Sequence, residues 1–345
     1  MGQARTWVCR GATVVLLVGL CVAAGFSCKG RSSGAAGTVV LYCSVDQAVA
    51  EPIVAEFEKQ TGIRVLARYD TEAAKTVGLV QRIRTEAAAP VADVFWSGEI
   101  FHTIRLAREG LLAPWESEAF NDWPDPFKAA DRTWYGLGLR GRVIAYHTGR
   151  VSGDEAPRSL EALLDEKWSG RIVMAAPEFG TTGGDVASWF VHYGPRRATE
   201  ILRGLAANRV RLVAGNSTAV RMVATGQADV CMTDTDDVYA AQRNNWPVAC
   251  HGLDQAGKGS LAIPNTAAVL KGAPHPEQAS ALMTFILGGT VEEMLARSDS
   301  HNGPVQADLS EEFAQYAIQP ALSVDYEDVA DMLPQAIATA MEILR

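Results

Sequence analysis

Three aspartates crowd one short segment of the chain. Asp234, Asp236 and Asp237 lie in the run TDTDD, directly after the apolar stretch ADVCM. Carboxylates this close repel one another unless a cation or a helix dipole offsets their charge. A helix N-terminus alone explains the cluster, whereas a ligand site here would attract a hard cation or a ligand amine. The glycine and distal glutamate of an EF-hand are absent. Thr235 and Asp236 are the candidate ligand contacts of this segment.

Two arginines supply the opposite charge. Arg140 and Arg142 lie in the strand-like run YGLGLRGRVIAYHT, and alternation along a strand places both on one face. A pair of guanidinium groups suits bidentate binding of a carboxylate or phosphate. A surface salt bridge is the alternative interpretation.

Glycines and hydroxyls meet in the segment 180–184, GTTGG, between a predicted strand and a predicted helix. Free backbone N–H groups near Gly180, with the hydroxyls of Thr181 and Thr182, suit an oxyanion. The alternative is an ordinary turn with a threonine cap. Asn216 and Ser217 repeat the pattern one unit later, and the segment lacks the GK[ST] ending of a Walker loop.

Polar residues also follow two earlier apolar runs. Ser44 and Asp46 come after TVVLYC, and Ser97 and Glu99 come at the end of ADVFWS. Each pair stands where a helix is predicted to begin, so capping of that helix is the alternative to ligand binding. Lys75 and its neighbour Thr76 also open a predicted helix near the same place.

Strands alternate with helices along the chain, which indicates a doubly wound α/β sheet. The body is longer than one core usually supports, so two lobes are expected. Ligands of such sheets bind beyond the carboxyl ends of the strands, where the candidate residues lie. Strands are predicted at 38–43, 63–69, 92–97, 135–148, 170–177, 210–215, 228–233 and 260–270, and helices at 48–60, 73–86, 101–109, 183–193, 195–207, 217–225, 276–287 and 291–296.

The N-terminus has the layout of a secretory signal. Arg5 and Arg10 precede an apolar run over residues 12–26, which is shorter than the roughly 20 residues of a membrane-spanning helix. The run GFSC resembles a bacterial lipobox, so we predict cleavage before Cys28 and its lipidation; plain signal cleavage is the alternative. Residues 28–37 are predicted to form a flexible tether.

Composition narrows the partners and the covalent chemistry. A net charge of −9 with no basic run argues against nucleic acid. Cys43, Cys231 and Cys250 remain in the body, and Cys231 with Cys250 either forms a disulfide or stays as two buried thiols.

Several stretches together resemble the periplasmic ferric-ion and related solute-binding proteins that serve ABC importers. They include LYCSVDQAVAEPIVAEFEKQTGIRV, ADVFWSGE, LRGRVIAYHT, KWSGRIVMAAPEFGTT and NSTAVRMVATGQADV. The resemblance implies a two-lobed periplasmic-binding-protein-like fold, each lobe a mostly parallel sheet flanked by helices, with the ligand cleft between the lobes. It implies lobe 1 at 38–138 and 256–298, lobe 2 at 139–255, and C-terminal helices at 299–345, mainly on lobe 2.

Iron-binding members of that family hold ferric ion with a histidine, a glutamate and two adjacent tyrosines. Here the histidine position carries Asp46, and the glutamate position falls at Gly98, with Glu99 one residue on. The tyrosine pair falls on Thr235 and Asp236, so phenolate ligation is absent. Asp46, Glu99 and Asp236 would be the ligands if a metal is bound.

The resemblance further implies a monomeric periplasmic carrier, lipid-anchored to a membrane, that passes its ligand to a membrane permease without catalysis or a resident cofactor. The ligand is either ferric ion with a synergistic anion or a small anion bearing phosphate or phosphonate. The alternatives are a secreted hydrolase and a receptor or scaffold with a vestigial cleft. The six histidines stand in no GxSxG or HExxH frame, which disfavours the hydrolase.

Overall fold

Ten strands form one sheet in the part of the chain that the structure describes. The structure is a computed structural model and describes residues 37–70, 75–254 and 257–345. The predicted signal segment, Cys28 and all of the tether except Gly37 lie outside these residues. The strands are β1 (Thr38–Cys43), β2 (Arg64–Tyr69), β3 (Val94–Ser97), β4 (Leu112–Ala113), β5 (Tyr135–His147), β6 (Ile172–Ala175), β7 (Arg211–Val213), β8 (Val230–Asp234), β9 (Val248–Gly252) and β10 (Ala262–Leu270).

Helices follow most of the strands, as the alternating pattern predicts. They are α1 (Gln47–Thr61), α2 (Val77–Thr85), α3 (Phe101–Arg108), α4 (Gly180–Tyr193), α5 (Pro195–Ala207), α6 (Asn216–Ala224), α7 (Thr235–Arg243), α8 (Pro276–Ile286), α9 (Gly289–Arg297), α10 (Ala307–Glu312) and α11 (Tyr326–Leu344). Short 3-10 helices lie at Glu118–Phe120, Glu161–Leu164, Glu166–Trp168 and Ala314–Tyr316.

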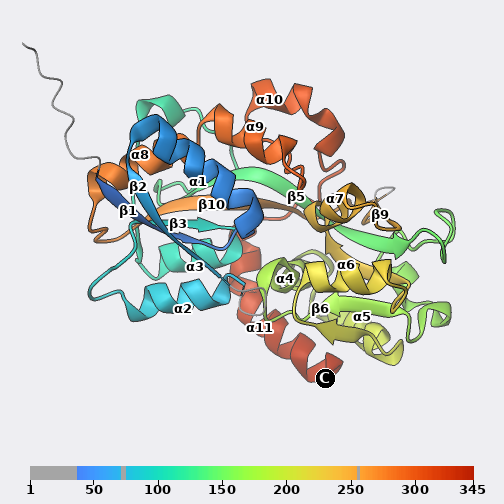
Figure 1. Ribbon diagram of the computed structural model, residues 1–345. Helices are drawn as coiled ribbons and strands as arrows, with labels where there is room; N and C mark the ends of the chain where they lie inside the picture. The colour runs from blue at the N-terminus through green and yellow to red at the C-terminus, as the bar shows by residue number, and fades with distance from the viewer. Residues whose placement is uncertain (1–36, 71–74, 255–256) are drawn as a thin grey trace, which may run out of the picture. The chain divides into compact units, whose positions relative to one another are not determined.

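Each half of the sheet has a parallel section, β1 to β3 in the first half and β6 to β8 in the second, and every strand pair that involves β5 or β10 is antiparallel. Strands run in the order β2-β1-β3-β10-β5-β8-β6-β7, with β4 beside β10 and β9 beside β5. β1 pairs in parallel with β2 and β3, and β6 pairs in parallel with β7 and β8. The long strand β5 pairs antiparallel with β10 along its first part (Figure 1). Along its second part, β5 pairs antiparallel with β8. This is the predicted two-lobed α/β fold, and β5 is the predicted crossover.

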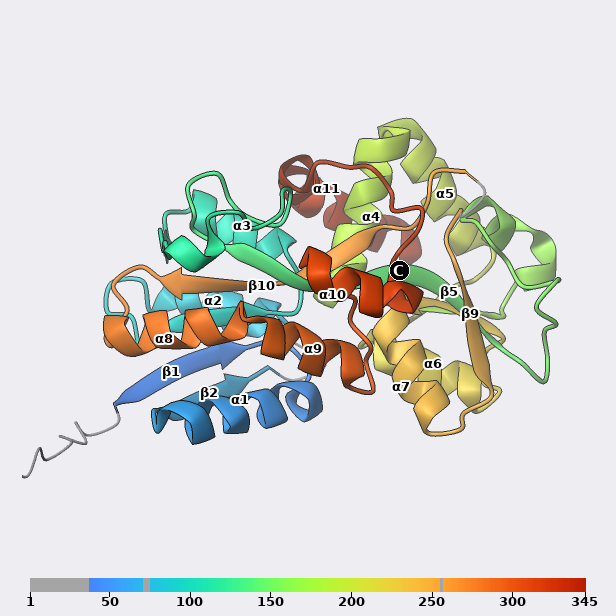
Figure 2. The same cartoon turned by 90° about the horizontal axis from the view of Figure 1, so that it is seen from above.

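Both faces of the first half are covered by helices, because the buried strands are apolar on both sides. Val39 and Leu41 of β1 belong to a core with α1, α8 and α9, whereas Val40 and Tyr42 belong to a core with α2 and α3. Figures 1 and 2 show these two groups of helices on opposite sides of the strands. In the second half, α4, α5 and α11 share the core of α2 and α3, while α6 and α7 cover the other face.

Helix boundaries differ from prediction where polar residues cluster. α1 ends at Gly62 as expected, since this glycine adopts a φ of +72° and its amide donates to Glu58 O at 2.8 Å. α4 begins at Gly180 rather than 183, and α6 begins at Asn216 rather than 217. The predicted turn 180–184 therefore forms the first helical turn.

The sequence pattern does not predict β9. Its five residues follow a helix, and they show little alternation of apolar and polar side chains.

Cys231 and Cys250 are free thiols. Their strands flank β5 on opposite sides, and both residues pair with Ala145. Two strand spacings separate the cysteine Cα atoms by about 9–10 Å, whereas a disulfide needs about 4.4–6.8 Å. The β-sheet register therefore excludes the disulfide that the sequence left open, and burial raises the pKa of Cys250 to about 11.

Among the described residues, no single helix has the length and apolar character to cross a bilayer, although the bent pair α8 and α9 passes that test by length and composition.

Gly184 of α4 lies against the ring of Phe101, which would overlap an added Cβ atom. Gly184→Ala is expected to lower the free energy of unfolding by about 1–3 kcal/mol, because both helices are fixed in a close-packed core. Urea denaturation measures this change. Gly289→Ala in α9 is the control, since its Cβ would meet its nearest neighbour at 3.8 Å. Equal effects of the two substitutions would contradict the packing argument.

Candidate functional site

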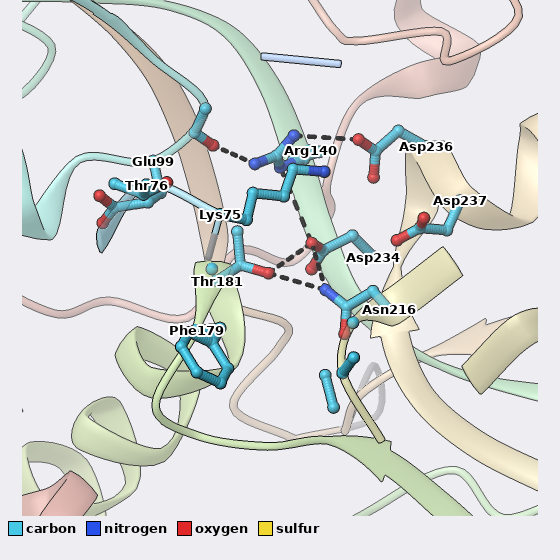
Figure 3. A pocket seen from close by; sticks show the side chains of 15 residues that line it. Lys75, Thr76, Glu99, Arg140, Phe179, Thr181, Asn216, Asp234, Asp236 and Asp237 are labelled. Atoms are coloured by element: carbon cyan, nitrogen blue, oxygen red, sulfur yellow. Dashed lines mark hydrogen bonds and ion pairs between the residues drawn. The ribbon is translucent and has the colours of Figure 1, made fainter. Parts of the chain in front are cut away.

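A pocket lies where the carboxyl ends of β3, β6, β7 and β8 converge, the expected place in an α/β sheet. Its cavity volume is about 20 Å³, enough for roughly one species the size of a water molecule. Figure 3 shows its side chains pointing toward one another from both halves of the sheet. The lining residues are Lys75, Thr76, Gly98, Glu99, Arg140, Ala175, Phe179, Gly180, Thr181, Ala214, Gly215, Asn216, Asp234, Asp236 and Asp237.

Arg140 of β5 lies at the centre of the pocket and is buried. Its Nη1 donates to Asp236 Oδ2 at 3.0 Å, and its Nη2 donates to the carbonyl of Gly98. Its Nε lies 3.8 Å from Asp234 Oδ2 and has no hydrogen-bond partner. Burial opposes the charge, but Asp236 and Asp234 outweigh it and raise the pKa of Arg140. Arg140 therefore links the end of β3 to the start of α7.

Arg142 lies beneath the pocket and does not line it. Its side chain is fully buried, and it donates to Asp185 Oδ2 at 3.0 Å and to Asp234 Oδ1 at 2.7 Å. The register of β5 with β8 places Arg142 directly opposite Asp234. Burial opposes this charge too, but the two carboxylates raise the pKa of Arg142. Its role is to hold Asp234 in place.

Asp234 takes up the donors that were predicted to bind an oxyanion. Thr181 Oγ1 donates to Asp234 Oδ2 at 2.5 Å, and Asn216 Nδ2 donates to the same oxygen at 3.0 Å. Thr182 Oγ1 donates to Asn216 Oδ1 at 3.2 Å. Burial opposes ionisation, but Arg142 and Arg140 lower the pKa of Asp234. These hydroxyl and amide groups are therefore engaged within the protein. Thr181 and Asn216 donate to Asp234, and Thr182 donates to Asn216.

The three aspartates converge at one end of the pocket. One oxygen from each of Asp234, Asp236 and Asp237 lies within 4.8 Å of the others. Asp236 is buried, and within residues 37–70, 75–254 and 257–345 its Oδ1 has no hydrogen-bond partner. Asp237 Oδ2 accepts from the hydroxyl of Thr233 at 3.1 Å. Burial and the repulsion of neighbouring carboxylates raise the pKa values of Asp236 and Asp237. A hard cation would relieve both costs.

Lys75 and Asp46 form an ion pair on the first half of the sheet. Lys75 Nζ lies 2.5 Å from Asp46 Oδ1. Burial opposes ionisation of Asp46, but Lys75 lowers its pKa. The carbonyl of Lys75 accepts a hydrogen bond from Gly180 N at 3.4 Å. Lys75 thus contacts both halves, and Asp46 reaches the pocket through it.

The remaining residues of the first half support the loop after β3. Ser44 Oγ accepts from Gly98 N at 2.9 Å and donates to Ser97 Oγ at 3.4 Å. Glu99 lines the pocket, but its Oε2 accepts from Phe101 N at 2.7 Å and so caps α3. The contacts of Glu99 are therefore those of a helix-capping residue, which was the alternative to ligand binding.

The predicted residues divide into two groups. Those that line the pocket are Glu99, Arg140, Gly180, Thr181, Asn216 and Asp236; those that lie beside or behind it are Ser44, Asp46, Ser97, Arg142, Thr182, Ser217 and Thr235. Thr235 accepts a hydrogen bond from Gly141 N at 3.1 Å. The sequence pattern places Lys75 near the site, but the predicted ligand contacts do not include Lys75, Asp234, Asp237 or Phe179. The TDTDD run was a signal for both aspartates, whereas nothing marked Phe179.

The charges around the pocket do not balance. The carboxylates of Asp46, Glu99, Asp185, Asp234, Asp236 and Asp237 number six, and the cations Lys75, Arg140 and Arg142 number three. Six negative charges against three positive charges leave an excess of three when all are ionised. The pocket therefore favours a cation over an anion.

Comparison with known proteins agrees with this architecture. The chain is 28% identical over 271 residues to iron uptake protein A1 of Synechocystis sp., covering 75% of this chain and 73% of that protein. It is 27% identical to a putative 2-aminoethylphosphonate-binding periplasmic protein of Salmonella typhi, with 74% and 73% covered. The crystal structure of iron-bound HitA from Pseudomonas aeruginosa superposes with a TM-score of 0.75 at 27% identity, covering 89% of this chain and 99% of that one.

The model of one protein family matches residues 39–298, which include every lining residue of the pocket. That span contains both halves of the sheet and the crossover strands β5 and β10. The chain belongs to the family of bacterial extracellular solute-binding proteins.

Proposed function

We propose that this protein is the periplasmic solute-binding component of an ABC importer and that it captures a hard cation, ferric ion, in the pocket beside Arg140. The observation that carries the proposal is Asp236. Its carboxylate is buried, one of its oxygens has no hydrogen-bond partner among the residues that the structure describes, and two further carboxylates lie within 4.8 Å. Carboxylate oxygens are suitable donors for a hard, highly charged ion.

Relatives support the choice of ferric ion. The Synechocystis relative is named an iron uptake protein, and the Pseudomonas structure is described as iron-bound. The residues that line this pocket include no tyrosine, so the donors would be carboxylates rather than phenolates. Asp236 and Asp237 would be the first ligands, with Asp46 supplied from the other half.

A small anion bearing phosphate or phosphonate is the second candidate. Arg140 Nε is buried without a partner, and the Salmonella relative is named for 2-aminoethylphosphonate. An amine of such a ligand would match Asp236. The cation is favoured for two reasons. Carboxylates outnumber cationic groups around the pocket, and the side chains of Thr181, Thr182 and Asn216 already donate to other groups of the protein.

The remaining features belong to the same proposal. Export, lipid attachment at Cys28, a monomeric state and transfer to a membrane permease would follow from membership in an importer. The proposed lobes are 38–138 with 256–298 and 139–255 with 299–345. The two parallel sections of the sheet support this division, although α11 packs on α3 as well as on α4 and α5.

Isothermal titration of the purified protein with ferric nitrilotriacetate tests the proposal. We expect binding of one ferric ion for each protein molecule, and weaker or no binding of inorganic phosphate and 2-aminoethylphosphonate. Tight binding of 2-aminoethylphosphonate without iron would replace the first candidate by the second. Binding of none of the three would favour a receptor or scaffold with a vestigial cleft.

A further inference from the structure

The turn that carries Lys75 has an unusual backbone. The next residue, Thr76, has a φ of +67°, a region that a β-branched residue seldom adopts. Thr76 is buried, and its hydroxyl donates to Ser44 Oγ at 3.1 Å. The amide of Gly180 donates to the Lys75 carbonyl at 3.4 Å, from the other half of the sheet. Contacts from both sides therefore hold Lys75 in the pocket.

The side chain of Lys75 extends across the pocket in the direction of the aspartates (Figure 3). Its Nζ lies 2.5 Å from Asp46 Oδ1, and its side chain is 22% exposed. Burial and mutual repulsion raise the pKa values of Asp236 and Asp237, and the Lys75 charge partly offsets this. The ammonium thus pairs directly with Asp46 on the first half, and its positive charge also acts on Asp236 and Asp237 of the second half.

We propose that Lys75 is a built-in competitor of the transported cation: its ammonium occupies the acidic pocket of the empty protein and leaves when a metal ion enters. This inference rests on the proposed function of the pocket. The small cavity supports it, because about 20 Å³ does not accommodate both a hydrated ion and the lysine head group. Departure of Lys75 also releases Asp46, which then becomes a ligand from the first half.

The exchange sets a threshold for binding. A metal ion gains access only when its attraction to the carboxylates exceeds that of the tethered ammonium, and Coulomb attraction grows with the charge of the ion. A trivalent ion exceeds this threshold, whereas sodium and potassium ions do not. Lys75 is thereby a specificity-determining residue.

The test compares Lys75→Met with Lys75→Arg by competitive titration of ferric nitrilotriacetate. Methionine keeps the length of the side chain and removes its charge, so the affinity for ferric ion is expected to rise at least about tenfold. Arginine keeps the charge, so the affinity of Lys75→Arg for ferric ion should stay near that of the wild type. Lys59→Met is the matched control, because this lysine is 75% exposed and pairs with Glu56 on α1.

Unchanged or lower affinity of Lys75→Met would overturn the inference, since a lower value means that Lys75 assists binding. Asp236→Asn in the same series separates this failure from failure of the proposed function. If Asp236→Asn binds iron as well as the wild type, the acidic pocket is not the site. If Asp236→Asn loses affinity and Lys75→Met gains none, only the role given to Lys75 is wrong.

Discussion

Asp236→Asn is expected to lower the affinity for ferric ion at least about 100-fold. Asp236 is the buried carboxylate with an unpartnered oxygen, and it lies within 4.8 Å of two others. Loss of a residue that only orients a metal ligand typically costs 10–100-fold in affinity, so loss of a ligand should cost more. Competitive titration with ferric nitrilotriacetate measures the effect.

The same substitution should leave the stability of the metal-free protein nearly unchanged. The pKa of Asp236 is raised, chiefly by burial, so folding favours the neutral form of this side chain, and a neutral asparagine loses no stability on that account. The asparagine oxygen can still accept from Arg140 Nη1, which donates to Asp236 in the wild type, and Asp234 remains beside Arg140 as a counter-charge. Asp229→Asn is the matched control. Asp229 lies at the other end of the β8 segment and pairs with Arg150 and Arg171, and although burial opposes ionisation, these arginines lower its pKa. The Asp229→Asn variant should lose stability and keep the wild-type affinity for ferric ion.

These two variants therefore have opposite signatures, and the contrast makes the test strict. If both variants lose affinity for ferric ion to the same degree, the loss reflects the reduced negative charge of the protein as a whole rather than the loss of a metal ligand. If Asp236→Asn unfolds at a markedly lower urea concentration than the wild type, its carboxylate has a structural role with Arg140, and the site assignment loses its main support.

Arg142→Met is expected to produce the largest loss of stability, about 3–5 kcal/mol in the free energy of unfolding. The guanidinium is fully buried and pairs with both Asp185 and Asp234. Removal of Arg142 leaves the buried Asp185 without its counter-charge and Asp234 with Arg140 alone, 3.8 Å away, and breaking a buried pair typically costs this much. Urea denaturation followed by tryptophan fluorescence measures the loss.

Arg243→Met on α7 is the control, because its pair with Asp299 has both side chains more than half exposed and such pairs contribute about 0–1 kcal/mol. The double variant of Arg142→Met with Asp185→Asn removes one stranded carboxylate and should recover part of the loss. A cost below about 1 kcal/mol for Arg142→Met, or no recovery in the double variant, would contradict the buried-charge account.

Local patterns predicted the elements well, because each was specified by residues close in sequence. Gly62 ends α1 through its own backbone freedom, and the apolar run TVVLYC is buried on both faces of β1. Local patterns failed where pairing between distant strands decided the outcome. β9 forms because β5 offers it an edge, and that same register keeps Cys231 and Cys250 apart.

The candidate site was predicted in outline and revised in detail. Arg140, Thr181, Asn216 and Asp236 line one pocket. Thr181, Asn216 and Asp236 were predicted from their positions after β-strands, and Arg140 from its charge on the crossover strand β5. Their contacts could not be predicted, because several partners compete for each donor. Thr181, expected to bind an anion, donates to Asp234 instead. Arg140 and Arg142 are only two positions apart, yet Arg140 lines the pocket and Arg142 lies beneath it.

By itself, the sequence determined the alternation of strands and helices, the crossover strand and the acidic run at the start of α7, since each depends on side-chain types a few residues apart. Only the tertiary structure decided which carboxylate stays without a partner and where the ammonium of Lys75 lies. Those outcomes depend on charges from both halves of the sheet, and the energy of a charge depends on distances and burial that exist only after folding.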